Sequence, residues 1–159
     1  MSEKQQQRAQ NVHASAVVVG EAGILIRGRS GRGKSALALA LIELARERGL
    51  FGRLIGDDRV LIETCGGRAL LSGAPEVSSL IERHGYGLES QPFEKTAVAR
   101  LVIDLLDNGE KAARMPEIAD EAATLGGIRL RRLVFDDFTR PFERARTALA
   151  ALVEGTTAL

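Results

Sequence analysis

The residues with the clearest chemical meaning form one short motif, in which Gly28 is followed by four residues and then by Gly33, Lys34 and Ser35. The two glycines let the backbone fold closely around a phosphate group, in conformations that other residues rarely adopt. The amides of such a loop, and of the helix that follows it, direct partial positive charge at an anion. Lys34 can reach the terminal phosphates, and the Ser35 hydroxyl can bind Mg²⁺. The motif therefore predicts a nucleotide-phosphate site made of Gly28, Arg29, Ser30, Gly31, Arg32, Gly33, Lys34 and Ser35.

Phosphoryl transfer also needs a carboxylate near the metal or the attacking group, and three segments offer one. Residues 54–58, 101–104 and 133–137 each read as an apolar strand that ends in aspartate. Open α/β sheets place their sites at such strand ends, although an aspartate there is more often a capping or solvated turn residue. Asp57 is favoured because it ends the first strand after the predicted phosphate-loop helix. The pattern alone leaves the choice among the three segments open.

Few other residues stand out by type and spacing. The chain has two histidines, His13 and His84, and one cysteine, Cys65, which are too few for a typical transition-metal site. A lone histidine is more often structural or solvated than catalytic. Composition alone gives Glu82 and Arg114 no special role, since both residue types are common in this chain.

The elements that must position these residues follow from hydrophobic patterning. Apolar runs at 16–19 and 24–26 predict two strands joined by a turn, and the second strand leads into the phosphate motif. An Ala- and Leu-rich helix is predicted over 36–48. Further along the chain we expect strands at 54–55, 60–62, 69–71, 99–104 and 128–135, a short helix at 77–81, a loop at 82–96 and a helix at 142–153. Residues 110–123 carry no clear pattern, and the fold class is α/β.

Length and composition limit the class of protein. A chain of 159 residues predicts one domain, here residues 12–159 after a polar tail at 1–11. Near-equal numbers of basic and acidic residues, 22 and 21, and an aromatic content of 4% argue against a nucleic-acid-binding protein. No apolar run is long enough to span a membrane, and no signal peptide is visible. With a single cysteine, a reduced cytoplasmic setting is the default expectation.

At this point the chain resembles the catalytic domain of the bacterial HPr kinase/phosphorylase family. The resemblance depends on the order of four elements over about residues 12–115. They are His13-Ala14 at a strand start, the phosphate motif, Asp57-Asp58-Arg59-Val60, and Glu82-Arg83-His84-Gly85-Tyr86-Gly87. The phosphate motif alone is generic, whereas its combination with the two later elements is much more specific.

The resemblance implies a P-loop fold related to phosphoenolpyruvate carboxykinase and a protein-serine kinase activity. Such an enzyme uses ATP and Mg²⁺ to phosphorylate a serine of HPr, the phosphocarrier protein of the phosphotransferase system. By position, Asp57 resembles the base that takes the serine proton, and His13 its catalytic neighbour. Lys34 would bind phosphate. Three residues would hold Mg²⁺, namely Ser35, Asp58 and Glu82, and Arg114 falls where the family has an active-site arginine.

The chain also departs from the family pattern. His84 stands where the family has arginine, and the later Pro-x-Arg-Pro-Gly-Arg-Asn stretch, associated with dephosphorylation, has no convincing match. We therefore expect kinase activity, which needs only the retained elements, whereas the sequence gives no support for phosphorylase activity. We also expect the family's N-terminal domain to be missing. The resemblance further implies a homo-oligomer, commonly a hexamer. Two alternatives stay open: a P-loop kinase of a small metabolite, and a non-enzymatic regulator that binds nucleotide.

Overall fold

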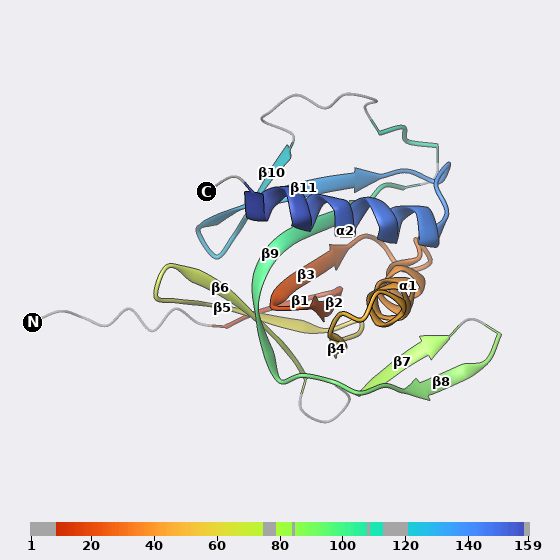
Figure 1. Cartoon of the computed structure of the whole chain (residues 1–159), viewed down its shortest axis with the longest axis horizontal. Helices are drawn as coiled ribbons and strands as arrows, with labels where there is room; N and C mark the ends of the chain where they lie inside the picture. Colours follow the sequence, from red (N-terminus) through yellow and green to blue (C-terminus); the bar gives the residue numbers. More distant parts are fainter. Residues whose placement is uncertain (1–8, 75–78, 84, 108, 113–120, 158–159) are drawn as a thin grey trace, which may run out of the picture.

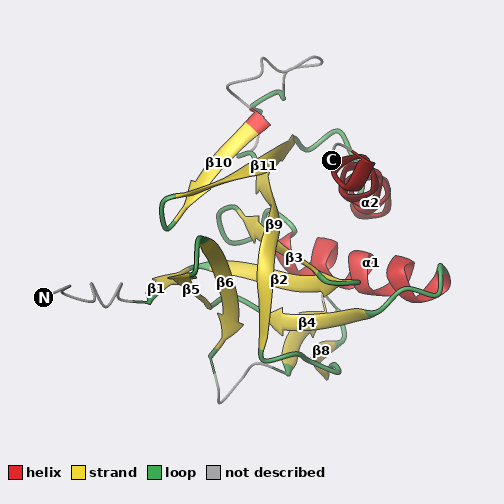
Figure 2. Ribbon diagram, turned by 60° about the vertical axis from the view of Figure 1, so that its left-hand side comes forward, coloured by secondary structure: helices red, strands yellow, loops and turns green. Residues whose placement is uncertain are grey.

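A large mixed sheet carries two helices on one of its faces (Figures 1 and 2). The computed structural model describes residues 9–74, 79–83, 85–107, 109–112 and 121–157. The helices are α1 (Lys34–Glu47) and α2 (Pro141–Thr157). The strands of the large sheet are β1 (Gln10–Val12), β2 (Ala14–Val19), β3 (Ala22–Arg27), β4 (Gly52–Gly56), β5 (Val60–Cys65), β6 (Arg68–Gly73), β9 (Thr96–Leu105), β10 (Ala122–Leu125) and β11 (Ile128–Phe135). A separate hairpin is formed by β7 (Leu80–Arg83) and β8 (Gly87–Ser90).

The long strand β9 organises the sheet. Its second half pairs in parallel with β3 on one side and with β11 on the other, while its first residues pair with β6. On the far side of β3, strand β2 pairs antiparallel with β3 and with β4, so β3 and β4 run in the same direction. The carboxyl ends of β3, β4, β9 and β11 therefore meet at one edge of the sheet, which is where open α/β sheets bind ligands.

Both faces of the sheet are buried, and the alternation along β2 shows how. Val17 and Val19 face the helices, whereas Ala16 and Val18 belong to the core on the opposite face. Successive strand residues point to opposite faces, so a strand of continuous apolar residues fits a position covered on both sides. The first core also contains the buried faces of α1 and α2, and the two helices pack against each other as well as on the sheet.

The strand register determines which polar residues come together. Ala14 on β2 lies opposite Arg27 on β3, and Arg27 lies opposite Asp104 on β9. Ala16 on β2 lies opposite Gly56, the last residue of β4. His13, the phosphate motif and the Asp57-Asp58 pair therefore all emerge at the same edge of the sheet.

Most predicted elements are confirmed, and three expectations are wrong. Strand β7 begins at Leu80, so residues 80–81 are not helical, and the predicted loop over 82–96 contains the rest of the β7–β8 hairpin. Its glycines at 85 and 87 have positive φ values and shape the hairpin turn. The predicted tail over 1–11 includes Gln10 and Asn11, which lie in β1 and pair with β5. The unassigned stretch 110–123 runs into β10, whose turn to β11 is the Gly126-Gly127 pair.

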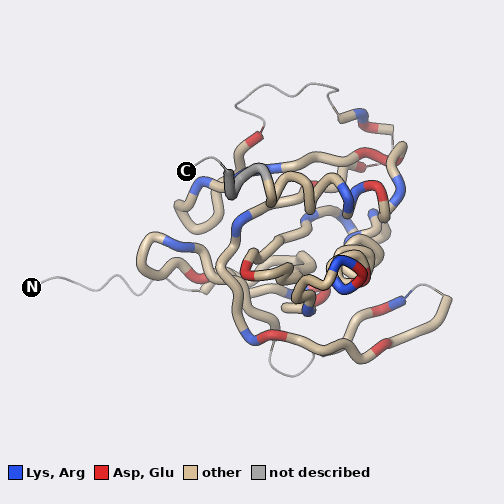
Figure 3. The backbone as a smooth tube through the Cα atoms, viewed as in Figure 1, with Lys and Arg blue, Asp and Glu red and all other residues tan. Residues whose placement is uncertain are grey.

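Charge is spread along the chain, with basic and acidic residues near one another in most segments (Figure 3). This distribution agrees with the near-zero net charge. Neither helix of that part combines the length and apolar character needed to cross a bilayer.

Candidate active site

The phosphate motif forms a loop between β3 and α1, and Lys34 is the first residue of the helix. Gly33 directly precedes it with a φ of 96°, a left-handed conformation that favours glycine. The Lys34 side chain is buried, with 5% of the residue exposed, and its Nζ donates to the Gly28 carbonyl oxygen at 2.8 Å. Burial lowers the pKa of Lys34, while the charges of Asp58 and Asp57 act in the opposite direction. The Lys34 ammonium group therefore bridges the two ends of the phosphate loop.

Asp57 follows the last residue of β4 and is the centre of a hydrogen-bonded cluster. The Ser35 hydroxyl lies 2.9 Å from both Asp57 carboxylate oxygens, and the Ser15 hydroxyl donates to Oδ1 at 2.5 Å. Ser15 is completely buried in β2, among alanines and valines. No arginine or lysine pairs directly with this carboxylate in the described part of the chain. Asp57 is therefore held by hydroxyl groups and keeps its negative charge unneutralised by a direct partner.

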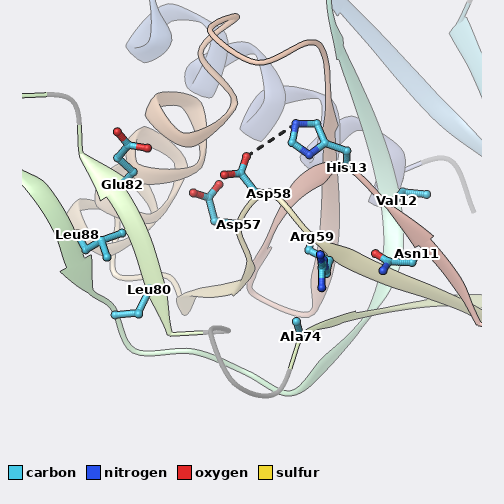
Figure 4. Close-up of a pocket in the computed structure, with 10 residues that line it drawn as sticks. All are labelled: Asn11, Val12, His13, Asp57, Asp58, Arg59, Ala74, Leu80, Glu82 and Leu88. Atoms are coloured by element: carbon cyan, nitrogen blue, oxygen red, sulfur yellow. Dashed lines mark ion pairs between the residues drawn. The ribbon is translucent and has the colours of Figure 1, made fainter.

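Asp58 and His13 lie beside the cluster, at the entrance of the loop. The His13 Nε2 atom is 4.0 Å from the Asp58 Oδ1 atom (Figure 4). The same nitrogen lies 3.3 Å from the Ser30 hydroxyl oxygen of the phosphate loop. Asp58 has a φ of 62°, and among the described residues no other non-glycine residue has a positive φ. This conformation costs about 1 kcal/mol or more, and such strain clusters at functional sites.

Two neighbouring cavities meet at these side chains. One, of about 900 Å³, is lined by His13, Asp57, Asp58 and Glu82 together with less polar residues of β1, β7 and β8 (Figure 4). The other, of about 760 Å³, contains the phosphate loop from Ser30 to Ser35 and runs along α1. Asp58 and Glu82 line both cavities. In Figure 4 the Asp57, Asp58 and Glu82 carboxylates extend into the space between β7 and the strand end of β4.

The donor set fits Mg²⁺ bound together with phosphates. Mg²⁺ prefers oxygen ligands and is usually held by one or two carboxylates, with substrate phosphates and water completing the shell. Ser35, Asp58 and Glu82 all offer oxygen atoms to the cavity that contains the phosphate loop. Within the described residues, no three His, Cys, Asp or Glu side chains gather into a metal cage of their own. These residues therefore suit a metal that arrives with a nucleotide rather than a permanently bound one.

The second candidate strand end, at Asp104, has different surroundings. Both of its carboxylate oxygens accept hydrogen bonds from Arg27, at 2.7 and 2.8 Å, and Oδ2 also accepts one from Arg132 at 2.5 Å. Burial tends to raise the pKa of Asp104, but the hydrogen bonds and charges of Arg27 and Arg132 outweigh it, and the net pKa is lowered. The Asp104 carboxylate thus links three parallel strands, and its oxygens are already paired with the Arg27 and Arg132 guanidinium groups.

The third candidate, Asp136, organises the loop that precedes α2. Its carboxylate accepts the backbone N–H groups of Ala112 and Phe138, each at 3.0 Å, and these bonds lower its pKa. Asp137 lies 4.0 Å from Arg32 of the phosphate loop. Only Asp57 is therefore hydrogen-bonded to Ser35 of the phosphate motif, whereas the third segment approaches the motif through the Asp137–Arg32 ion pair.

Sequence reasoning brought together most of these residues and missed others. His13, Lys34, Ser35, Asp57, Asp58 and Glu82 line the two cavities as a group, while Arg114 lies outside the described residues. Arg29 points to Asp107, at 3.3 Å, rather than to the aspartate pair. Ser15 was missed, although a single serine within an apolar strand is a recognisable signal of a buried polar contact.

Comparison with known families agrees with this geometry. The family model described as "HPr Serine kinase C-terminal domain" matches residues 4–123, about three quarters of the chain. The chain belongs to the HPr serine kinase C-terminal domain family. The domain's phosphate motif, the Asp57-Asp58 pair and Glu82 all lie within the matched range.

Two similar curated proteins are both named HPr kinase/phosphorylase. An HPr kinase/phosphorylase of Chlorobium phaeobacteroides is 30% identical over 109 residues, which are 64% of this chain and 30% of that protein. One from Chloroherpeton thalassium is 41% identical over 80 residues, covering 50% of this chain and 22% of that protein. The chain therefore spans about a third or less of the length of these curated relatives.

A solved structure supports the fold class. The structure of the Hpr(Ser) kinase/phosphatase from Coxiella burnetii superposes with a TM-score of 0.73 at 22% identity. The match covers 92% of this chain and 99% of that one, so it extends beyond the residues that the family model matches. The prediction of an α/β domain with a phosphate loop and a mixed sheet is confirmed.

Proposed function

We propose that residues 12–159 form a single catalytic domain that transfers the γ-phosphoryl group of ATP to a serine hydroxyl of HPr. The observation that carries this proposal is the direct contact between the Ser35 hydroxyl and the Asp57 carboxylate. This contact joins the phosphate loop and the unneutralised aspartate into one site. Family membership supports HPr as the protein substrate, and ATP is the phosphoryl donor that such a phosphate loop suits.

Each residue of the site has a separate role in phosphoryl transfer. Asp57 accepts the proton of the serine hydroxyl as the new bond forms between the serine oxygen and the γ-phosphorus. The bond between that phosphorus and the bridging oxygen breaks at the same time, and ADP leaves. Lys34 and the amides of residues 28–35 neutralise charge on the phosphate oxygens. His13, next to Ser30 and Asp58, orients these groups at the entrance of the loop.

Mg²⁺ belongs to the same proposal. Ser35, Asp58 and Glu82 would hold it against the phosphates, where it neutralises developing negative charge on the nucleotide. Arg114 would add a further positive charge, as the family resemblance implies. A cytoplasmic setting and a homo-oligomer follow from the same resemblance, and light scattering would test the hexamer. The unmatched Pro-x-Arg-Pro-Gly-Arg-Asn stretch favours a kinase direction without phosphorolysis.

The test is a transfer assay with ATP labelled at the γ-phosphate, Mg²⁺ and purified HPr. We expect one phosphate per HPr on a serine, located by mass spectrometry, and no transfer to an HPr variant in which that serine is alanine. The Lys34→Met variant is the matched control on the enzyme. Nucleotide binding without transfer would favour the regulator, and transfer to a small metabolite but not to HPr would favour the metabolite kinase. Either result overturns the proposal.

A further inference from the structure

The cavity that contains the phosphate loop continues beyond it, along one face of α1. Ala36, Leu39, Ala40 and Glu43 line this extension, and their spacing of three and four residues places them on a single helix face. From Ser35 to Glu43 the helix rises about 12 Å. The cavity thus offers phosphate-binding groups and an extension along α1 that is lined by apolar side chains and by the Glu43–Arg83 ion pair.

Another wall of this cavity comes from the far end of the sequence. Pro141 and Phe142, the first two residues of α2, line the same cavity as Lys34 and Ser35. Phe142 remains 43% exposed, although an aromatic ring is stabilised by burial. In Figure 1 the amino-terminal end of α2 lies next to the start of α1.

A buried arginine of α2 lies next to the phosphate loop and holds the segment that precedes this wall. Arg144, one turn into α2, is 6% exposed and donates to the Asp136 carbonyl oxygen at 2.5 Å and to the Thr139 hydroxyl at 3.1 Å. A side chain added at Gly33 would meet the Arg144 guanidinium at 3.7 Å. Arg32 of the loop approaches Asp137 at 4.0 Å. The ring of Phe142 is therefore carried by a segment that is held in place against the nucleotide-phosphate site.

We propose that Phe142, with Pro141 beside it, contacts the base of the bound nucleotide, and that this wall makes the site prefer ATP over phosphate compounds that lack a base. The inference rests on the proposed function, since it takes the phosphates to bind at residues 28–35. A planar base attached to those phosphates has an aromatic face that stacks well on a phenyl ring. Continuity between the apolar wall and the phosphate loop within one cavity favours the nucleotide's own base over an apolar side chain of a protein partner.

The test compares ATP with tripolyphosphate, which offers the phosphates without base or sugar. Binding of each, with Mg²⁺, is measured by titration calorimetry for the whole chain and for the Phe142→Ala variant. We expect the substitution to weaken ATP roughly tenfold, the effect typical of losing one base–aromatic stack, and to leave tripolyphosphate unchanged. Phe138→Ala is the matched control, because Phe138 lies in the loop just before α2, is 73% exposed and does not line the cavity.

A fluorescence measurement provides a second readout that does not depend on affinity. The chain contains no tryptophan, so Phe142→Trp introduces a single reporter at the wall. Its emission should change on addition of ATP and stay constant with tripolyphosphate, while a Phe138→Trp control should respond to neither.

The outcomes separate this inference from the proposed function. If the Phe142→Ala variant binds ATP as tightly as the unchanged chain, or loses ATP and tripolyphosphate equally, the inference is wrong, and serine transfer by the unchanged chain would still support the proposed function. Unchanged ATP binding with weakened HPr phosphorylation would assign the wall to the protein substrate and also overturn the inference. If the unchanged chain is folded but binds neither ATP nor tripolyphosphate, both proposals fail.

Discussion

Two aspartates that end parallel strands at the same edge of the sheet have contrasting surroundings. Asp57, after β4, belongs to a cavity group with Lys34, Ser35 and Asp58, where its oxygens meet only hydroxyl donors among the described residues. Asp104, near the end of β9, belongs to an ion-pair group with Arg27 and Arg132. The comparison shows that a strand-end position offers a carboxylate, and that the charges on neighbouring strands decide whether it is available for chemistry.

The energetic consequences differ in the same way. The ion-pair group links β3, β9 and β11 with charges of opposite sign, so the carboxylate contributes to stability. The cavity group instead holds a buried lysine and a strained aspartate, both of which cost stability in the absence of ligand. We therefore expect substitutions in the first group to change folding and substitutions in the second to change binding and transfer.

The largest effect is expected from Lys34→Met. The substitution removes the ammonium that neutralises phosphate charge, so transfer to HPr should fall on the order of 10³-fold, as measured by initial rates with labelled ATP. Because burial penalises this charge in the folded chain, thermal unfolding should shift little or upward. A large loss of stability would show that Lys34 also holds the fold and would weaken the comparison.

Asp104→Asn should give the reverse result, a loss of stability with little change in the rate of transfer. Loss of the charge leaves Arg27 and Arg132 without their shared carboxylate, and the free energy of unfolding should fall by roughly 2–3 kcal/mol at neutral pH in urea titrations. The folded pKa of Asp104 is lowered, so its stabilising contribution is present above the ordinary pKa and is lost as pH falls through the folded value. The difference between this variant and the unchanged chain should accordingly shrink below about pH 4. A difference that stays constant down to strongly acidic pH would contradict this explanation.

Ser15→Ala tests whether the buried hydroxyl positions Asp57. Removing one neutral donor to a carboxylate costs about 1–2 kcal/mol, so the rate of transfer at saturating ATP should fall roughly fivefold to thirtyfold. The dissociation constant for ATP should not change, because Ser15 touches Asp57 and not the phosphate loop. An equal loss in ATP affinity, measured by calorimetry, would indicate a general disturbance of the site.

The smallest effect is expected at Asp58. Glycine accepts a φ of 62° without strain, so Asp58→Gly should raise the free energy of unfolding by up to about 1 kcal/mol while weakening Mg²⁺-dependent transfer. Asp58→Asn is the matched control, since asparagine tolerates the same backbone conformation but removes the charge. If the glycine variant is less stable than the unchanged chain, the strain at this position is not the cost that we infer.

The sequence predicted local chemistry well and long-range partners poorly. The phosphate motif, its helix and Asp57 were predictable because each depends on residues within a short window and on the order of strand and helix. The role of Asp104 was not predictable, because its partners Arg27 and Arg132 lie 77 and 28 residues away and are two of many arginines. The same limit applies to Arg144 and Phe142, which reach the phosphate loop only after α2 packs on α1.

The missed hairpin has a local cause. Residues 80–90 contain two glycines and charged residues, a composition that is also typical of loops. The hairpin is held by Ile81, buried in the core beside α1, and by Arg83, which pairs with Glu43 and Glu89. These contacts place Glu82 on the cavity, so the error in secondary structure did not hide the predicted site residue.

The most direct test of the central claim compares Asp57→Asn with Asp104→Asn in single-turnover transfer from ATP to HPr, with Mg²⁺, saturating nucleotide and equal concentrations of folded protein. We predict that Asp57→Asn lowers the rate on the order of 10³-fold, as expected for loss of a general base, and that Asp104→Asn stays within a few fold of the unchanged chain. Transfer by Asp57→Asn at a near-normal rate, or an equally large loss in Asp104→Asn, would contradict the assignment of chemistry to one strand end and stability to the other.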